Sequence, residues 1–114
     1  MKHVMRLQKE PFESIESGEK TFELRLYDEK RQAIRVGDEL EFILANDPSR
    51  TLRCEVIALH RFDSFEALYR ALPLLRCGYT KKTLAKASPA DMEKYYSVQQ
   101  QKKYGVLGIE LRLQ

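Results

Sequence analysis

The stretch GEKTFELRL at residues 18–26 decides the fold of this chain. Its second half alternates between apolar and polar residues, which predicts a half-buried strand over 20–26. The apolar face holds Phe22, Leu24 and Leu26, and the polar face holds Thr21, Glu23 and Arg25. Side chains on one face of a strand lie about 7 Å apart, so Glu23 and Arg25 lie side by side. Lys20 enters from the turn, at the mouth of the cleft that we expect there.

The composition predicts one folded domain over residues 1–114. Hydrophobic residues make up 43 % of the 114 residues and charged residues 32 %, which is typical of a globular protein. No apolar run reaches the roughly 18 residues of a membrane helix, and the N-terminus lacks the apolar core of a signal peptide. Cys54 and Cys77 show no paired spacing and are expected to be buried thiols. The sequence therefore predicts a cytoplasmic protein without a membrane partner.

Positive charge is concentrated in one part of the chain. Residues 76–103 carry seven basic side chains against two acidic ones, although the net charge of the whole chain is only +3. Such asymmetry is typical of proteins that bind a polyanion, above all nucleic acid. It also fits a solvated, lysine-rich helical face. The lysines expected to face RNA are Lys81, Lys82, Lys86, Lys102 and Lys103.

Hydrophobic periodicity predicts five strands and several short helices. We expect strands over 2–8, 20–26, 39–44, 52–59 and 105–113, and helices over 10–18, 63–72 and, as two short pieces meeting near Tyr96, 88–103. Polar connections or turns are expected at 27–32, 36–38 and 46–49, while 74–87 is ambiguous. Short strands joined by turns, with short helices inserted, indicate an α+β fold whose sheet curls into a small barrel.

Several kinds of chemistry lack their sequence signature. There is no phosphate-binding loop of the Walker or dinucleotide type, so no cofactor is predicted. The two histidines and two cysteines are too scattered to predict a metal site, and they indicate no nucleophile–histidine pair.

Tyrosines are interleaved with the lysines of the basic segment. Tyr95 and Tyr96, at the end of a predicted short helix, are candidates for stacking on bases beside phosphate contacts. The alternative is that they anchor the core and extend a hydroxyl to a polar partner.

The order of these motifs resembles one known family. The Gly-x-Lys-Thr-x-Glu-x-Arg pattern of 18–25 follows a Pro-Phe-x-x-Ile helix at 11–15 and precedes Val-Gly-Asp-x-Leu-x-Phe at 36–42. Together with the segment 95–109, they resemble the ASCH domain of the PUA-like superfamily. The resemblance implies a PUA-like β-barrel with a cleft, lined by the first motif, that receives RNA or a nucleotide-like ligand.

Some bacterial relatives in this family are amidohydrolases that deacetylate N4-acetylcytidine. They use the lysine of Gly-x-Lys, a threonine three residues later and a glutamate from a distant helix. Lys20 matches the first of these, Glu23 stands at the threonine position, and Glu66 is the nearest candidate for the third. The resemblance therefore implies an incomplete catalytic set, and the enzyme question stays open.

Two functional interpretations follow from the residues. In the first, Lys20, Thr21, Glu23, Arg25 and Tyr96 bind RNA or a nucleotide-like small molecule, the cations contacting phosphate or carbonyl oxygen. In the second, the protein is a small hydrolase that acts on a modified nucleoside such as N4-acetylcytidine or on RNA. Glu23 is then the general base, and Lys20 or Arg25 stabilises the oxyanion. Glu23 between two cations stays ionised and weakly basic, which favours binding.

Overall fold

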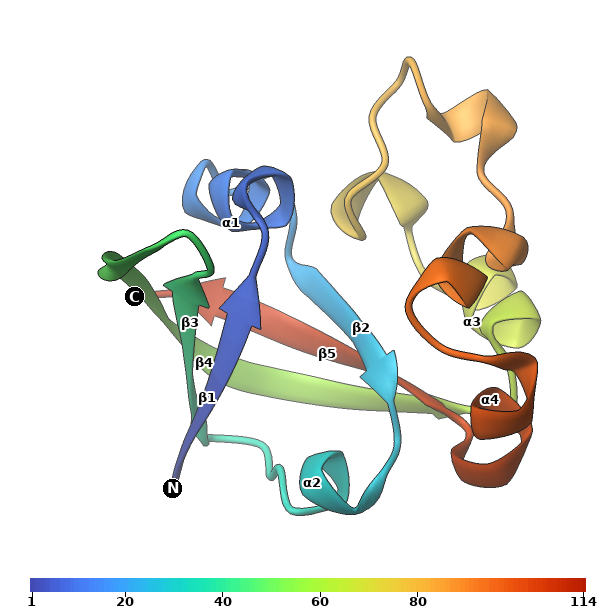
Figure 1. The fold of residues 1–114 in the computed structure, drawn as a ribbon, viewed down its shortest axis with the longest axis horizontal. Coiled ribbons are helices and arrows are strands. Elements are labelled where there is room, and N and C mark those ends of the chain that lie inside the picture. Colours follow the sequence, from blue (N-terminus) through green and yellow to red (C-terminus); the bar gives the residue numbers. More distant parts are fainter.

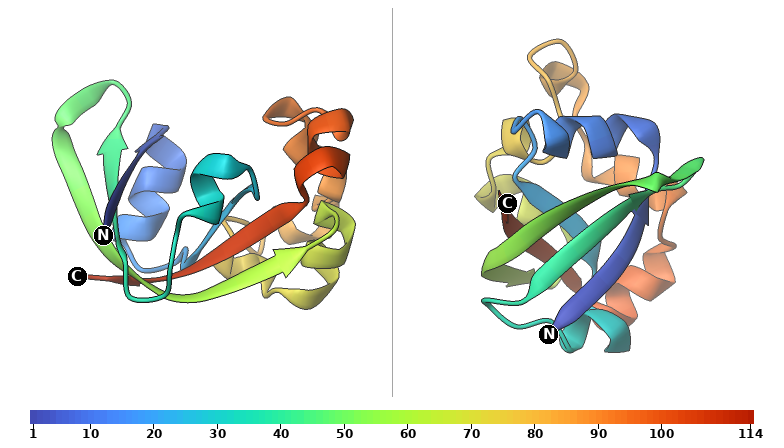
Figure 2. Two further views of the ribbon diagram at one scale, coloured as in Figure 1. Left: turned by 90° about the horizontal axis from the view of Figure 1, so that it is seen from below. Right: turned by 90° about the vertical axis from the view of Figure 1, so that its left-hand side faces the viewer.

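A five-stranded sheet curls around part of the chain and forms the frame of the molecule. The computed structural model describes all of residues 1–114. Along the sheet the strands lie in the order β1 (Lys2–Leu7), β3 (Glu39–Leu44), β4 (Asp47–Phe62), β5 (Val106–Leu113) and β2 (Phe22–Leu26). β1 pairs with β3 in parallel, and the other neighbours are antiparallel. Figure 1 shows the arrangement, and the left view of Figure 2 shows the sheet bending into an open half-barrel. The predicted α+β fold with a curled sheet is confirmed.

Short helices cover both sides of this sheet. α1 (Lys9–Glu16) and α2 (Glu29–Gln32) lie within the curl, whereas α3 (Phe65–Ala71) and α4 (Val98–Tyr104) lie at the far end of β4 and β5 (Figure 2). Three 3-10 helices, η1 (Leu74–Arg76), η2 (Leu84–Lys86) and η3 (Pro89–Lys94), occupy the chain between α3 and α4. None of the helices is long and apolar enough to cross a membrane.

Side-chain oxygens at the helix starts explain several of these boundaries. Ser64 accepts a hydrogen bond from the backbone N–H of Ala67, and Ser97 forms a reciprocal capping box with Gln100. At the other end of α1, Gly18 takes a φ of +84°, a left-handed conformation that glycine adopts without strain. The predicted break near Tyr96, between η3 and α4, is confirmed.

Alternation along the central strands divides the interior into two cores. On β5, Leu107, Ile109 and Leu111 enter the core inside the curl, whereas Val106 enters the core on the outer side, beneath α3. The inner core also contains Phe12 and residues of β1, β3 and β4, and the outer core contains the apolar face of β2.

Three predicted boundaries are wrong. The connection 27–32 contains α2, which begins after Asp28 because the Asp28 carboxylate accepts the backbone N–H of Arg31. The turn predicted at 46–49 falls at 45–46 instead, so that β4 already begins at Asp47. β4 also runs on to Phe62, beyond the predicted 59, because pairing with β5 continues to Val106.

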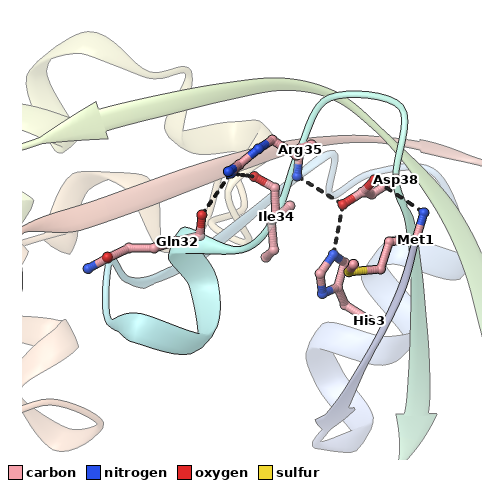
Figure 3. A network of polar contacts seen from close by, with 6 residues as sticks. All are labelled: Met1, His3, Gln32, Ile34, Arg35 and Asp38. Atoms are coloured by element: carbon pink, nitrogen blue, oxygen red, sulfur yellow. Dashed lines mark hydrogen bonds and ion pairs between the residues drawn. The ribbon is translucent and has the colours of Figure 1, made fainter.

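The turn before β3 is fixed by a buried carboxylate, Asp38 (Figure 3). Its Oδ2 accepts hydrogen bonds from the backbone N–H of Arg35, at 2.9 Å, and lies 2.8 Å from Nε2 of His3. These bonds hold the pKa of Asp38 below its usual range, at about 2. Asp38 therefore ties β1 to the turn that starts β3.

Candidate ligand-binding site

β2 carries two ionisable side chains into the inside of the curl. Its apolar residues point to the outer core, so Glu23 and Arg25 point the other way. Across the sheet, Glu23 stands opposite Ile109 and Arg25 opposite Leu107, both of which are fully buried. Glu23 itself is only 5 % exposed. β2 is thus covered on both faces, and its polar face is not a solvated surface.

Glu23 binds one cation with each of its carboxylate oxygens. Its Oε1 lies 3.0 Å from Nζ of Lys20, and its Oε2 accepts a hydrogen bond of 2.7 Å from Nε of Arg25. The side chains of all three residues are largely buried. We call Lys20, Glu23 and Arg25 the ion triad. It holds two positive charges and one negative charge, and therefore a buried excess of +1.

The triad also fixes the protonation state of its carboxylate. Burial alone raises the pKa of Glu23, but Lys20 and Arg25 together outweigh it and hold that pKa below its usual range. Burial likewise lowers the pKa of Arg25, and the carboxylate of Glu23 more than compensates. Glu23 is therefore an ionised hydrogen-bond acceptor at neutral pH.

Lys20 connects the triad to a cavity. Its backbone N–H donates to the carbonyl of Ser14 at 2.9 Å, and that of Thr21 donates to the carbonyl of Arg76, also at 2.9 Å. Gly78, with a φ of +112°, passes so close that a β-carbon there would meet Nζ of Lys20 at 3.8 Å. Lys20 and Thr21 line a cavity of about 420 Å³ between the end of α1 and the end of β5. Of the two residues, Lys20 is the one that also contacts Glu23.

Two further side chains gather beside Arg25. Burial raises the pKa of the Tyr96 hydroxyl, an effect that the neighbouring guanidinium groups of Arg25 and Arg31 oppose. Arg31, on α2, holds the Asp28 carboxylate with its Nη1 at 3.0 Å, while its buried Nε has no hydrogen-bond partner. The sequence argument missed Arg31. Asp28 is a capping residue, and Arg31 follows it at the i, i+3 spacing. This pattern is the sequence signal that could have predicted α2 and the position of the Arg31 guanidinium.

A family model covers nearly the whole chain. The model of the ASCH domain matches residues 5–113. The chain belongs to the ASCH domain family. No protein of curated function matches the chain.

Solved structures show the same fold for this ASCH domain. The protein PH0355 is 30 % identical, with a TM-score of 0.80, and 100 % of each chain is covered. PF0455 from Pyrococcus furiosus is also 30 % identical, with a TM-score of 0.76 over 99 % of this chain and 97 % of that one. The S128A mutant of ZmASCH from Zymomonas mobilis is 13 % identical, and its TM-score of 0.68, over 97 % of this chain and 67 % of that one, shows likeness of fold.

The structure brings together one group of the predicted residues and separates another. The ion triad brings together three of the predicted residues, Lys20, Glu23 and Arg25. Tyr96 lies beside Arg25, and Thr21 lines the adjoining cavity. Lys20 is less exposed than its predicted place at a cleft mouth implies, since only 11 % of its side chain is exposed. The exposed lysines divide into two sets: Lys81, Lys82 and Lys86 lie in the loop around η2, and Lys102 and Lys103 on α4, at opposite ends of the helical side in Figure 1.

Other candidates lie apart from the triad. Glu66 points from α3 into solvent, where it pairs with Arg70 at 3.6 Å. Cys54 and Cys77 are free and buried, as predicted, and burial raises the pKa of each thiol to about 11, which leaves both protonated and unreactive at neutral pH. No three side chains of the metal-binding types lie close enough together to hold an ion.

Proposed function

We propose that this ASCH domain binds RNA or a nucleotide-like ligand at the cavity beside the ion triad. The observation that carries the proposal is the buried excess of one positive charge. Burying three ionic groups is expensive, and apolar residues of similar volume stabilise a core at least as well. A ligand oxygen with negative charge would neutralise the excess, which gives the triad a purpose beyond stability.

Each residue of the site has a chemical role in this proposal. Lys20, at the cavity, is placed to donate to a phosphate or carbonyl oxygen. Glu23 accepts from a base amino group or a ribose hydroxyl, and it also fixes the directions of both cations. Arg25 presents its remaining donors near the hydroxyl of Tyr96, whose ring packs on the outer core and stacks on Phe65. Thr21 supplies a hydroxyl at the cavity wall.

Direct binding measurements test this proposal. We would titrate the protein with cytidine 5′-monophosphate and with a fluorescein-labelled RNA octamer at fixed salt. Lys20→Met should weaken binding of both by about tenfold or more, because a hydrogen bond to a charged group contributes roughly 1.5–3 kcal/mol. Lys9→Met removes an exposed lysine of α1 and serves as the matched control. Equal affinities for the two variants and the wild type would refute a ligand site at Lys20.

Hydrolysis of a modified nucleoside is the competing function. Its general base would have to be Glu23, whose lowered pKa makes it a weak base, or Glu66, which lies exposed on α3. We therefore expect no Lys20-dependent release of acetate from N4-acetylcytidine. Release that Lys20→Ala abolishes would establish an enzyme in place of a binding protein.

A further inference from the structure

A second groove lies where β4 leaves the sheet and α4 returns to it. Its volume is about 620 Å³, larger than that of the cavity beside Lys20. The lining residues come from the end of β4, from α3 and from the end of α4: Arg61, Phe62, Asp63, Ala67, Lys102, Lys103, Tyr104 and Gly105.

The charges of this groove are mostly unpaired. Arg61, Lys102 and Lys103 bring three positive charges against the single carboxylate of Asp63. None of these four side chains belongs to an ion pair of the structure. By contrast, the guanidinium groups of Arg25, Arg31 and Arg112 each contact a carboxylate. The groove is therefore a concentration of free cations.

Aromatic rings lie beside two of these cations. The guanidinium carbon of Arg61 stands 4.0 Å from the ring centroid of Tyr27, and Nζ of Lys103 stands 5.1 Å from that of Tyr104. Contact with a ring limits the freedom of a long side chain and keeps its charged end in place. Rings beside phosphate-binding cations are the combination that single-stranded nucleic acid uses.

The register of the sheet connects this groove to the ion triad. Arg25 on β2 and Arg61 on β4 both stand opposite Leu107 on β5, so all three share one cross-strand row. An irregularity of β4 between Val56 and Ala58 makes this possible. Before this irregularity, the even-numbered residues of β4 face the inner core, and after it the odd-numbered residues face that core. Arg61 therefore lies on the same face of the sheet as Arg25. Two strand spacings separate these residues, about 10 Å.

We propose that the groove, which lies at the other end of β5 from the cavity beside Lys20, is a second phosphodiester subsite for an oligonucleotide bound at the ion triad. The ligand class is then a single-stranded oligonucleotide, and a free nucleotide fills only part of the site. This inference rests on the proposed function and extends it along the row from Arg25 to Arg61. Lys102 and Lys103 contact the phosphate groups, and Arg61 lines the groove beside them.

The last turn of α4 gives these lysines a second effect, on stability. Cations near a helix C-terminus interact favourably with the helix dipole. A purely structural role predicts a lower melting temperature without any change in the preference for an oligonucleotide. The test must therefore measure preference, not stability alone.

Paired lysine variants measure that preference. The octamer and cytidine 5′-monophosphate are titrated against wild type, K102Q/K103Q and K81Q/K82Q, which remove the same charge from neighbouring exposed lysines on α4 and on the η2 loop. K102Q/K103Q should lower the octamer-to-monophosphate affinity ratio about tenfold at low salt, and lower the salt slope of octamer binding by about 1.4. K81Q/K82Q should lower the ratio by a smaller factor. Arg61→Gln removes a groove cation that is not on α4, and it should also lower the octamer-to-monophosphate affinity ratio.

The outcomes separate this inference from the proposed function. If the monophosphate binds through Lys20 but the ratio is unchanged in K102Q/K103Q and in Arg61→Gln, the subsite is refuted and the proposed function stands. An equal or larger loss of the ratio in K81Q/K82Q also refutes it, and places the phosphate contacts on the η2 loop. If neither ligand binds the wild type, both proposals fail.

Discussion

Glu23 and Asp38 are the two buried charged side chains of this ASCH domain, and they are satisfied in opposite ways. Asp38 is bound by the backbone N–H of Arg35, by His3 and by the N-terminal ammonium group of Met1, and it closes a turn between two strands. Glu23 is bound by two cationic side chains that bring more charge than it carries. The ammonium group beside Asp38 is exposed to solvent, whereas both cations beside Glu23 are largely buried.

The comparison shows that burial of a carboxylate does not by itself mark a functional site. Both groups have a pKa below the usual range, although Asp38 links segments 35 residues apart and Glu23 binds residues of its own stretch. What distinguishes Glu23 is that it has two buried cationic partners and that one of them, Lys20, lines a cavity. Variants of the two carboxylates should therefore differ both in stability and in binding.

The largest expected effect is that of Glu23→Gln. This change leaves Lys20 and Arg25 buried without a counter-charge, which costs about 3–5 kcal/mol in the free energy of unfolding. Urea denaturation of the variant beside wild type measures this cost. A loss below about 1 kcal/mol would show that the triad is hydrated and behaves as a surface ion pair.

A smaller effect is expected for Asp38→Asn. The amide keeps one acceptor oxygen but loses the charge that attracts its donors, so the expected cost is about 1–3 kcal/mol. Binding of cytidine 5′-monophosphate should be unaffected, since Asp38 lies at the turn before β3 and outside the ion triad. Weaker binding in a folded Asp38→Asn protein would contradict the contrast between the two carboxylates.

Removing one cation should cost less than removing the carboxylate. Arg25→Met leaves Glu23 paired with Lys20 as a neutral pair, and Lys20→Met leaves it paired with Arg25. Both variants should lose about 1–3 kcal/mol of stability, together with ligand binding. The sequence analysis expected Lys20 at the mouth of a cleft, and its burial raises the stability cost that we expect for Lys20→Met. Thermal melts of the two variants, with anisotropy titrations of the octamer, check both effects.

Acid should weaken the fold through both carboxylates. Because the pKa of Asp38 in the folded protein is about 2, below its unfolded value near 3.9, its contribution is complete above about pH 4 and is lost as the pH falls towards 2. The lowered pKa of Glu23 acts in the same direction. Melting temperatures between pH 5 and 2 should therefore fall more steeply for wild type than for Asp38→Asn. Parallel curves would contradict the role of Asp38.

The smallest effect is expected for the exposed pair of Glu66 and Arg70. These side chains are 71 % and 75 % exposed, so Glu66→Gln should change stability by no more than about 0.5 kcal/mol. The same denaturation measurement provides the baseline for the buried carboxylates. A cost like that of Glu23→Gln would mean that burial does not govern these energies.

Local pattern predicted most of the strands because each has one dominant period. The alternation at 22–26 and at 39–44 survives in β2 and β3, since their apolar faces are buried as the pattern requires. α2 was missed because its four residues are polar and it depends on one cap, Asp28, rather than on an apolar face. Residues 74–87 form short 3-10 turns, which have no periodicity to detect.

The site was partly predictable for a similar reason. Glu23 and Arg25 are two residues apart on one strand, so their contact follows from strand geometry. The approach of Tyr96 and Arg31 depends on tertiary packing of α2 and of the segment before α4, which spacing cannot give. Arg61 joins the face of Arg25 only because of the irregularity in β4, a feature without a clear sequence signal.

The pairing of β2 has a consequence for the order of folding. β2 lies in the first quarter of the sequence, yet its one partner in the sheet is β5, at residues 106–113. Contacts between such distant residues form late, because closing a long loop costs entropy before pairing compensates for it. During synthesis, Glu23 and Arg25 therefore lack the wall of Leu107 and Ile109 until nearly all of the chain has been made. The proposed binding site is therefore among the last parts of the molecule to form, and we expect a nascent chain that still lacks β5 not to bind the ligand.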